Sequence, residues 1–295
     1  MISVIIPTNR CDAWLRDSIL SVLNSRCNVE YEVIVIGNNL SDNEEISWYE
    51  LQRELGSKVR FLRLGSVSLV DALNFGVYCA EFDYIARLDS DDFMDAARLQ
   101  IQFDFLEANR DVAVLGSAVA LIGPNSESLG VRYFPEMNSD ILACFRYGNC
   151  LAHPSVMFRR KIFNLVGGYS NDFTHAEDFD LFTRIARQFQ LHNLPQRLTS
   201  YRVFPDQISS KNILEQWEVS NRIIRREFLH YNGRLNFKFQ IQKQILDDRY
   251  RSAIQKWGKV SKFLFNAPKL SKGLLLDFSS TRPYVWQALR NFRRK

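Results

Sequence analysis

The sequence contains few of the features that mark secreted or membrane-spanning proteins. Its five cysteines are scattered, odd in number and free of any CxxC pair, which disfavours a disulfide framework or a zinc site. The longest apolar stretch, residues 113–123, is shorter than the roughly 20 residues that a membrane span needs. Because the N-terminal residues also lack the basic leader and cleavage pattern of a signal peptide, we expect a cytoplasmic protein.

Sequence signatures of several enzyme classes are missing as well. The chain has no Walker loop, no GxGxxG and no GxSxG, and its four histidines do not occur at metal-ligand spacing. No nucleic-acid-binding module is recognisable, so we expect no nucleic-acid partner. The apolar content of 46% and charged content of 24% are ordinary for a globular protein, so what the chain does must be sought in particular residues.

Charge is distributed unevenly along the chain. Residues 1–210 hold 19 Lys and Arg against 27 Asp and Glu, whereas residues 211–295 hold 19 against 6. We therefore predict one large domain over residues 1–210 and a helical, basic C-terminal region over residues 211–295. In the second region aromatic residues alternate with cations, which suits an anionic membrane surface, where each cation contributes about 1 kcal/mol. A helical cap that packs on the first domain would explain the same composition.

The hydrophobic pattern predicts an α/β fold. Strands are expected at residues 2–7, 31–36, 58–64, 83–88 and 112–123, and helices after Asp12 and at 48–55, 68–80, 96–109 and 177–189. Residues 155–163 and 198–204 resemble strands or strand–helix junctions. Because the early strands are apolar on both sides and each is followed by a helix, we predict a mostly parallel, Rossmann-like sheet flanked by helices.

Three polar loops follow the expected strands. They are PTNR at 7–10, GNNLSDN at 37–43 and DSDD at 89–92. In sheets of this kind, ligands bind outside the carboxyl ends of the strands. We therefore expect the three loops to meet at one site.

The DSDD loop is the strongest single indication of chemistry. Asp89 and Asp91 can share one divalent cation, and their hard oxygen ligands select Mg²⁺ or Mn²⁺. Capping of the following helix by Asp92 or Asp95 is the alternative, but it accounts for only one of the four aspartates. A calcium loop of the EF-hand type lacks its glycine and distal glutamate here, and Phe93 breaks the pattern of DxDxT phosphatases.

A second acidic group, HAEDFD at 175–180, stands at the start of the helix expected at 177–189. Thr174 and Glu177 have the spacing of a capping box. Asp178 falls in the first helical turn, where the helix dipole favours its ionised form, and an ionised carboxylate can accept a proton from a hydroxyl. Asp180 is a weaker candidate for that role.

The order of these blocks resembles family-2 glycosyltransferases of the GT-A fold. The similarity covers residues 2 to about 210 and includes SVIIPTNR, YEVIVI, DALNFGVYCAEFDYIARLDSDD, RLQIQFDFLEANRDVAVLGS, HPSVMFRRKIFNLVGGY, HAEDFDLFTRIA and YRVFPDQIS. Because no Q-x-x-R-W motif and no membrane spans follow, the resemblance favours a single transfer over processive synthesis. It implies an inverting, metal-dependent hexosyltransferase that acts on nucleotide-sugars.

The resemblance also assigns roles to individual residues. Asp89 and Asp91 match the DxD motif that holds Mn²⁺ or Mg²⁺ on the donor diphosphate, and Asp178, with Glu177 beside it, matches the general base of the family. The other implied nucleotide-sugar-binding residues are Pro7, Thr8, Asn9, Arg10, Asn38, Asn74, Arg87 and Ser90, with Asp89 contributing as well. The implied acceptor-side residues are His153, Gly168 and Tyr169.

One departure from the family pattern concerns the base of the nucleotide. Where the family usually has two aspartates in a DDGS-like turn, this chain has Gly37, Asn38 and Asn39. Asn38 can still accept the N3–H of uracil or thymine, without the assistance of a charge. A UDP-sugar is therefore the favoured donor, followed by a dTDP-sugar, with GDP less favoured. The tyrosine of the usual PTYNR is also missing.

The acceptor implied by the resemblance is a hydroxyl of a glycan or of a lipid-linked sugar. Such enzymes build bacterial O-antigen, capsule or exopolysaccharide, and they work at the inner face of the cytoplasmic membrane. Two alternatives stay open at this point. A sugar-nucleotide pyrophosphorylase needs a glycine-rich signature that PTNR does not supply, and a non-catalytic sugar-nucleotide-binding subunit or sensor is supported only by the altered GNN loop.

Overall fold

The computed structural model describes residues 1–204 and 212–231. Contacts divide the chain into two units, Met1–Phe228 and Leu229–Lys295, and the features described below belong to the first unit. Residues 232–295, which contain most of the predicted basic C-terminal region, lie outside the described residues.

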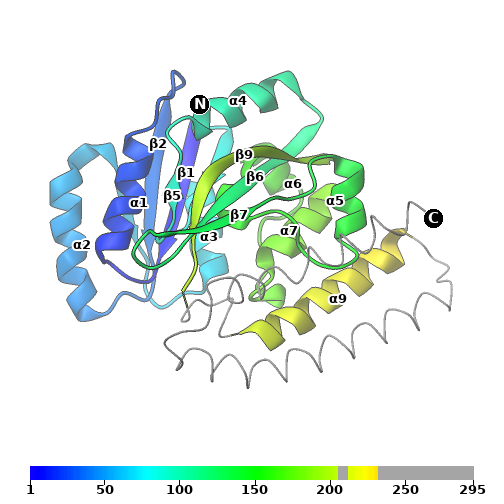
Figure 1. The fold of residues 1–295 in the computed structure, drawn as a ribbon. Coiled ribbons are helices and arrows are strands. Elements are labelled where there is room, and N and C mark those ends of the chain that lie inside the picture. Colours follow the sequence, from blue (N-terminus) through cyan, green and yellow to red (C-terminus); the bar gives the residue numbers. More distant parts are fainter. Residues whose placement is uncertain (205–211, 232–295) are drawn as a thin grey trace, which may run out of the picture. The chain divides into compact units, whose positions relative to one another are not determined.

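Four parallel strands form the first half of the sheet, in the order β3-β2-β1-β4 (Figure 1). Their bounds are β1 Ile2–Thr8, β2 Tyr31–Gly37, β3 Arg60–Arg63 and β4 Tyr84–Arg87. The connecting helices are α1 Ala13–Leu23, α2 Asp42–Leu55, with the short 3-10 helix η1 Gly56–Lys58 after it, and α3 Leu69–Cys79. Asp12 caps α1 as predicted, because its side chain accepts a hydrogen bond of 3.1 Å from the backbone N–H of Leu15.

The sheet separates two hydrophobic cores because side chains alternate along each strand. In β1, Ile2, Val4 and Ile6 face the core that contains residues of α1, α2 and α4, whereas Ile5 faces the opposite core. Side chains of α3 and α7 belong to that opposite core. Helices therefore cover both faces of the sheet, which confirms the predicted α/β architecture.

The second half of the sheet is mixed. Strand β8 (Met157–Arg159) lies antiparallel between β4 and β6 (Val112–Ile122), and β6 pairs in parallel with β9 (Gln190–Arg202). Two further antiparallel strands, β5 (Phe93–Met94) and β7 (Ser128–Arg132), pair with β9 and β6. The predicted strand at 112–123 is confirmed. Strand β9, by contrast, begins eight residues before the predicted run at 198, because the polar residues and Pro195 near its bulge hide its strand pattern.

The remaining helices lie around this mixed region. They are α4 Arg98–Ala108, α5 Asn138–Cys144, α6 Arg160–Leu165, α7 Glu177–Ala186 and α9 Ile213–Tyr231, with short 3-10 helices η2 His153–Ser155 and η3 Asn171–Phe173. Residues 155–163 form the predicted strand–helix junction, β8 followed by α6. Helix α5 was not predicted from the sequence, and α4 starts two residues later than predicted.

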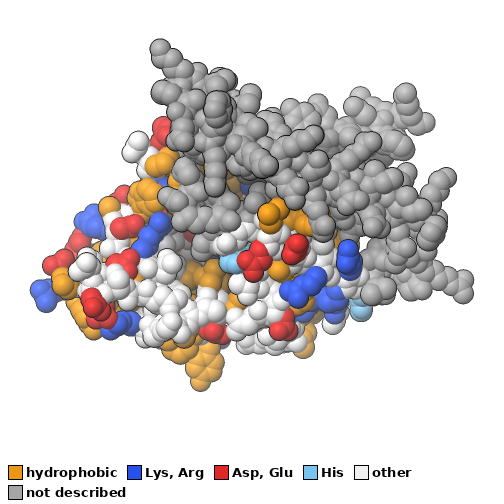
Figure 2. Space-filling model, turned by 90° about the horizontal axis from the view of Figure 1, so that it is seen from below, with side chains coloured by type: hydrophobic (Ala, Val, Ile, Leu, Met, Phe, Trp, Pro, Cys, Tyr) orange, Lys and Arg blue, Asp and Glu red, His pale blue; other side chains and the backbone are white. Residues whose placement is uncertain are grey.

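Surface charge in the described part of the protein is mixed. On the face shown in Figure 2, acidic and basic side chains stand near one another. Among the described residues, no helix is both long enough and apolar enough to span a bilayer.

Candidate active site

The loops after β1, β2 and β4 meet at one edge of the sheet, as predicted. The backbone N–H of Asn38 donates a 2.8 Å hydrogen bond to the carbonyl of Thr8, which joins the first loop to the second. Arg10 forms an ion pair of 3.1 Å with Asp91, which joins the first loop to the third. The parallel order of β2, β1 and β4 brings these polar residues together.

The loop after β4 gathers three carboxylates at one point. Oxygen atoms of Asp89, Asp91 and Asp92 lie within 4.8 Å of one another. Two arginines compensate part of this charge, since Arg87 pairs with Asp89 and Arg10 pairs with Asp91. Burial, followed by the charge of Asp89, raises the pKa of Asp91 to about 6.

Asp92 differs from its sequence-based interpretation. The prediction that it caps the following helix is wrong, because its side chain is buried and its Oδ1 accepts a 2.8 Å hydrogen bond from the backbone N–H of Arg202. Burial, followed by the charges of Asp89 and Asp91, raises its pKa well above the usual range. Asp95 instead binds the turn before α4, where its Oδ1 accepts from the N–H of Ala97 at 2.8 Å.

This cluster has the properties of a site for a hard divalent cation. All of its ligand atoms are carboxylate oxygens, the donor type that Mg²⁺ and Mn²⁺ prefer. Within the described part of the chain, Asp92 Oδ2 is buried without a hydrogen-bond partner. A buried carboxylate oxygen without a partner is costly, and a cation would relieve both that cost and the repulsion within the cluster.

Glu177 and Asp178 occupy the first turn of α7. The predicted capping box is wrong, because Ala176 occupies the N-cap position and Thr174 donates instead to the carbonyl of Asn171 at 3.1 Å. Asp178 accepts a 2.7 Å hydrogen bond on Oδ2 from the side-chain amide of Asn149. Burial raises the pKa of Glu177.

His153 and Tyr169 form a buried, hydrogen-bonded pair. The His153 Nε2 and the Tyr169 hydroxyl are 2.8 Å apart. Burial, followed by the charge of Arg87, lowers the pKa of His153 well below its usual value, so the imidazole is neutral near pH 7. Burial raises the pKa of Tyr169, and Asp178, Glu177 and Asp89 add to that increase.

Asn74 holds the turn that carries Tyr169. Its amide donates to the Tyr169 carbonyl and accepts from the Tyr169 N–H, both at 3.0 Å. Gly168, at φ 68°, packs so closely that a Cβ atom would lie 2.8 Å from the Asn74 oxygen. Glycine is thus required here by both conformation and space.

Several residues of the site gave no signal in the sequence. Arg98 of α4 is fully buried and donates to the carbonyls of Arg87, Pro154 and Val156, which fixes the end of β4. Arg202 of β9 donates from Nε to the carbonyl of Asp91 at 2.8 Å. The sequence pattern predicts a surface position for a single arginine in a helix or strand. The roles of Arg98 and Arg202 in holding the end of β4 and the following loop are therefore evident only from their burial and contacts.

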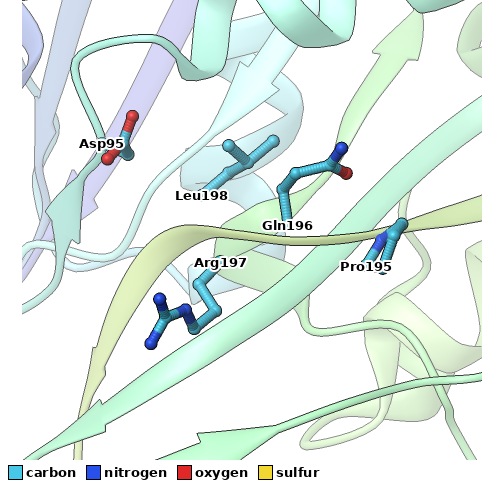
Figure 3. Close-up of a pocket in the computed structure, with 5 residues that line it drawn as sticks. All are labelled: Asp95, Pro195, Gln196, Arg197 and Leu198. Carbon is cyan, nitrogen blue, oxygen red and sulfur yellow. The ribbon is translucent and has the colours of Figure 1, made fainter.

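The remaining predicted residues lie in the same three loops or at their rim. Thr8 ends β1, Ser90 is buried between the aspartates, and Asn9 is exposed. A hollow of about 480 Å³ lies nearby on the surface, lined by Asp95 and by residues 195–198 of β9 (Figure 3). It contains none of the residues that the sequence assigns to the site.

Comparisons with known proteins agree with this geometry. The profile of the family described as "Glycosyl transferase family 2" matches residues 3–166. The O-antigen biosynthesis glycosyltransferase WbnJ of Escherichia coli is 32% identical over 240 residues, which are 80% of this chain and 92% of that protein. An Escherichia coli enzyme named UDP-Gal:alpha-D-GlcNAc-diphosphoundecaprenol beta-1,3-galactosyltransferase is 31% identical over 173 residues, 58% of this chain and 62% of that protein.

Solved structures show the same fold. The crystal structure of S. aureus TarS 1-349 in complex with UDP-GlcNAc has a TM-score of 0.60 and 18% identity, and the match covers 77% of this chain and 66% of that one. The complex of the same protein with UDP has a TM-score of 0.58 and 20% identity, with 77% and 65% covered. This chain thus spans slightly less than two thirds of the TarS chain. The family profile and the curated relatives together show that the chain is a glycosyltransferase and belongs to glycosyl transferase family 2.

Proposed function

We propose that this glycosyltransferase moves a sugar from a UDP-sugar to a hydroxyl of a glycan or lipid-linked acceptor, with inversion at the anomeric carbon, in bacterial O-antigen or related surface-polysaccharide synthesis. The names of two relatives support the setting, since one is an O-antigen enzyme and the other uses a UDP-sugar and a lipid diphosphate. Within this proposal, residues 1–210 and helix α9 constitute the catalytic part.

One observation carries the proposal. Arg98 donates to the carbonyls of Arg87, at the end of β4, and Pro154, next to His153. Arg184 of α7 donates to the carbonyl of Gly168, next to Tyr169. His153 Nε2 and the Tyr169 hydroxyl are 2.8 Å apart. Two acidic groups separated by almost ninety residues in the sequence are thus connected through the His153–Tyr169 pair, which supports a single site for both. The arrangement suits a donor diphosphate at the first group and an acceptor hydroxyl at the second.

Asp89, Asp91 and Asp92 are the residues that would hold a divalent cation. When bound, Mg²⁺ or Mn²⁺ neutralises negative charge on the diphosphate of the donor and on the departing nucleoside diphosphate. Arg10 and Arg87, which pair with Asp91 and Asp89, supply fixed positive charge beside the same diphosphate. The guanidinium of Arg87 is buried, and within the described chain its Nε and Nη1 have no hydrogen-bond partner.

Asp178 is the general base of the proposed reaction. It takes the proton of the acceptor hydroxyl while that oxygen attacks the anomeric carbon, and the bond from that carbon to the diphosphate oxygen breaks with its electron pair. An α-linked donor then gives a β-linked product and a nucleoside diphosphate. Asp178 lies in the first turn of α7, where the positive end of the helix dipole favours negative charge.

The loop after β2 is proposed to bind the nucleotide base. The side-chain nitrogen of Asn38 donates to the carbonyl of Val67 at 3.3 Å. The side-chain oxygen of Asn38 is then the atom that can accept the N3–H of uracil. Asn39 adopts a positive φ of 56°, a conformation that asparagine tolerates better than most residues. Thymine presents the same N3–H, so a dTDP-sugar is the second choice of donor.

Asn74 has a supporting role in this proposal. Its amide nitrogen and oxygen both bind the backbone of Tyr169, so it shapes the acceptor wall formed by His153, Gly168 and Tyr169.

Two substitutions test the proposal. Asp178→Asn should lower sugar transfer about 10²- to 10⁴-fold while UDP binding in Mn²⁺ stays unchanged. Asp91→Ala should abolish the Mn²⁺-dependent part of UDP binding. Transfer is measured with purified enzyme and a lipid-linked sugar acceptor, and UDP binding by calorimetry. Full transfer activity in Asp178→Asn would refute the base, and equal UDP affinity with and without Mn²⁺ in the wild type would refute the metal.

A further inference from the structure

Helix α9 packs on the part of the chain that contains Asp178 (Figure 1). Val219, Ile223 and Ile224 of α9 belong to the hydrophobic core that also includes Phe179 and Phe182 of α7. Helix α9 lies at the start of the basic region predicted over residues 211–295. It thus packs against α7, the helix that begins with Glu177 and Asp178.

Two contacts from α9 hold the chain just before α7. The Gln216 side-chain amide donates to the carbonyl of His175 at 2.8 Å, and Arg222 Nη2 donates to the carbonyl of Asp172 at 2.6 Å. His175 has φ 70°, a conformation uncommon for a residue with a side chain. Such a conformation persists only where surrounding contacts impose it, and α9 supplies one of them three residues before Asp178.

A third contact holds α7 just after the acidic pair. Arg226 donates to Asp180 Oδ1 at 2.5 Å and to the Thr183 hydroxyl at 3.1 Å. Asp180 is fully buried, and its other oxygen is bound by Arg184 at 2.6 Å. Arg184 also donates to the carbonyl of Gly168, in the turn that carries Tyr169. One buried carboxylate therefore connects α9, α7 and the acceptor wall.

We propose that α9 positions the general base of this enzyme. Arg226 acts through Asp180, and Gln216 acts through the His175 carbonyl, so that the first turn of α7 presents Asp178 to the acceptor hydroxyl. Neither residue touches the reacting atoms, and both are positioning residues. The inference rests on the proposed role of Asp178. A displacement of about 1 Å at a reacting group can cost roughly 100-fold in rate, so these remote contacts matter for turnover.

Arg226→Gln in the full chain tests the proposal. We expect kcat for transfer to fall about 10- to 100-fold. The KM for the donor and Mn²⁺-dependent UDP affinity should stay unchanged, because the residues proposed to bind the donor lie at the ends of β1, β2 and β4, in the loops after them and in α3. Arg226→Lys keeps the positive charge but has only one side-chain nitrogen, whereas Arg226 binds Asp180 and Thr183 with two. Its kcat should therefore lie between those of the wild type and Arg226→Gln. Arg225→Gln, on the exposed side of the same helix, is the matched control and should match the wild type. A wild-type kcat in Arg226→Gln, or an equal loss of UDP affinity, would overturn the proposal.

A double substitution separates this proposal from the role of Asp178 itself. If Arg226 acts through the base, Asp178→Asn with Arg226→Gln should be no slower than Asp178→Asn alone. Independent, multiplying losses would overturn the positioning role, whereas an active Asp178→Asn would refute the base instead. If Arg226→Gln does not fold, Gln216→Ala decides by the same measurements, since it removes a different contact to the same segment.

Discussion

The side-chain amide of Asn149 donates a 2.7 Å hydrogen bond to Asp178 Oδ2, and the Asn149 oxygen accepts from the backbone N–H of Leu151. Because the Asn149 oxygen is bound to Leu151, the Asn149 nitrogen is the atom that faces Asp178. Asn149, which lies between α5 and η2, therefore orients the carboxylate, whereas α9 holds the helix that carries it.

Asn149→Ala should lower kcat for transfer about 10-fold while the donor KM stays constant, because the carboxylate loses one orienting partner. Asn149→Asp should be slower still, since it places a second carboxylate against the first. Steady-state kinetics with both substrates measure the effect, with the exposed Asn28→Ala as control. An Asn149→Ala enzyme with wild-type kcat would show that this contact has no part in turnover.

Gly37, which the resemblance aligns with the first aspartate of the family's turn, lies close against Trp48. A Cβ atom at position 37 would lie 2.9 Å from the buried Trp48 ring and 2.8 Å from Leu40. Gly37→Ala should therefore destabilise the fold by about 1–3 kcal/mol through overpacking. Urea unfolding measures this loss.

A matched pair of variants checks the cause. Gly37→Ala combined with Trp48→Leu should lose less stability than the two single losses predict together, because the smaller side chain makes room. Gly65→Ala, where open space surrounds the added carbon, is the control. Additive losses would rule out the clash with Trp48.

The neutral, buried His153 predicts a pH dependence of stability. Its pKa in the folded protein is lowered by burial and then by Arg87, whereas in the unfolded chain it returns to about 6.5. The stabilisation is fully present above the unfolded-state pKa of about 6.5 and is lost as the pH falls below it. The free energy of unfolding then decreases by up to about 1.4 kcal/mol per pH unit, until the pH reaches the lowered pKa of His153 in the folded protein.

This dependence is isolated by comparison with a variant. His153→Gln keeps a hydrogen-bonding partner for Tyr169 and should lose less stability than the wild type between about pH 6.5 and pH 5. Urea unfolding at several pH values measures the difference. Parallel curves for His153→Gln and the wild type would contradict a neutral buried imidazole.

Truncation after Tyr231 tests the proposed membrane contact without removing α9. Residues 232–295 carry 15 Lys and Arg against three Asp, and each cation near an anionic surface contributes about 1 kcal/mol. The truncated protein should no longer sediment with vesicles of phosphatidylglycerol and phosphatidylcholine. The full chain on pure phosphatidylcholine is the control. Retained binding by the truncated protein would favour a packing role for these residues.

Much of the fold could be predicted because its signals are local. The apolar runs of β1 and β2 define buried strands by their own composition, and Asp12 marks the start of α1 by the contact it makes three residues later. The loops after β1, β2 and β4 were expected together because parallel strands end at the same edge. Strand β8 was not placed next to β4, since its three residues carry no signal of their neighbours.

The sequence by itself determined the α/β class, the three loops and the acidic residues, since periodicity and motifs act over a few neighbouring positions. Only the tertiary structure decided which distant partners those residues have. In the folded protein the buried Asp92 accepts a hydrogen bond from the backbone of Arg202, 110 positions away, and Asp178 accepts one from Asn149, 29 positions away. The buried Asp180 likewise accepts one from Arg226. Such contacts follow from how the sheet and helices pack on one another, and they matter because a buried charge is costly unless a partner lies close to it.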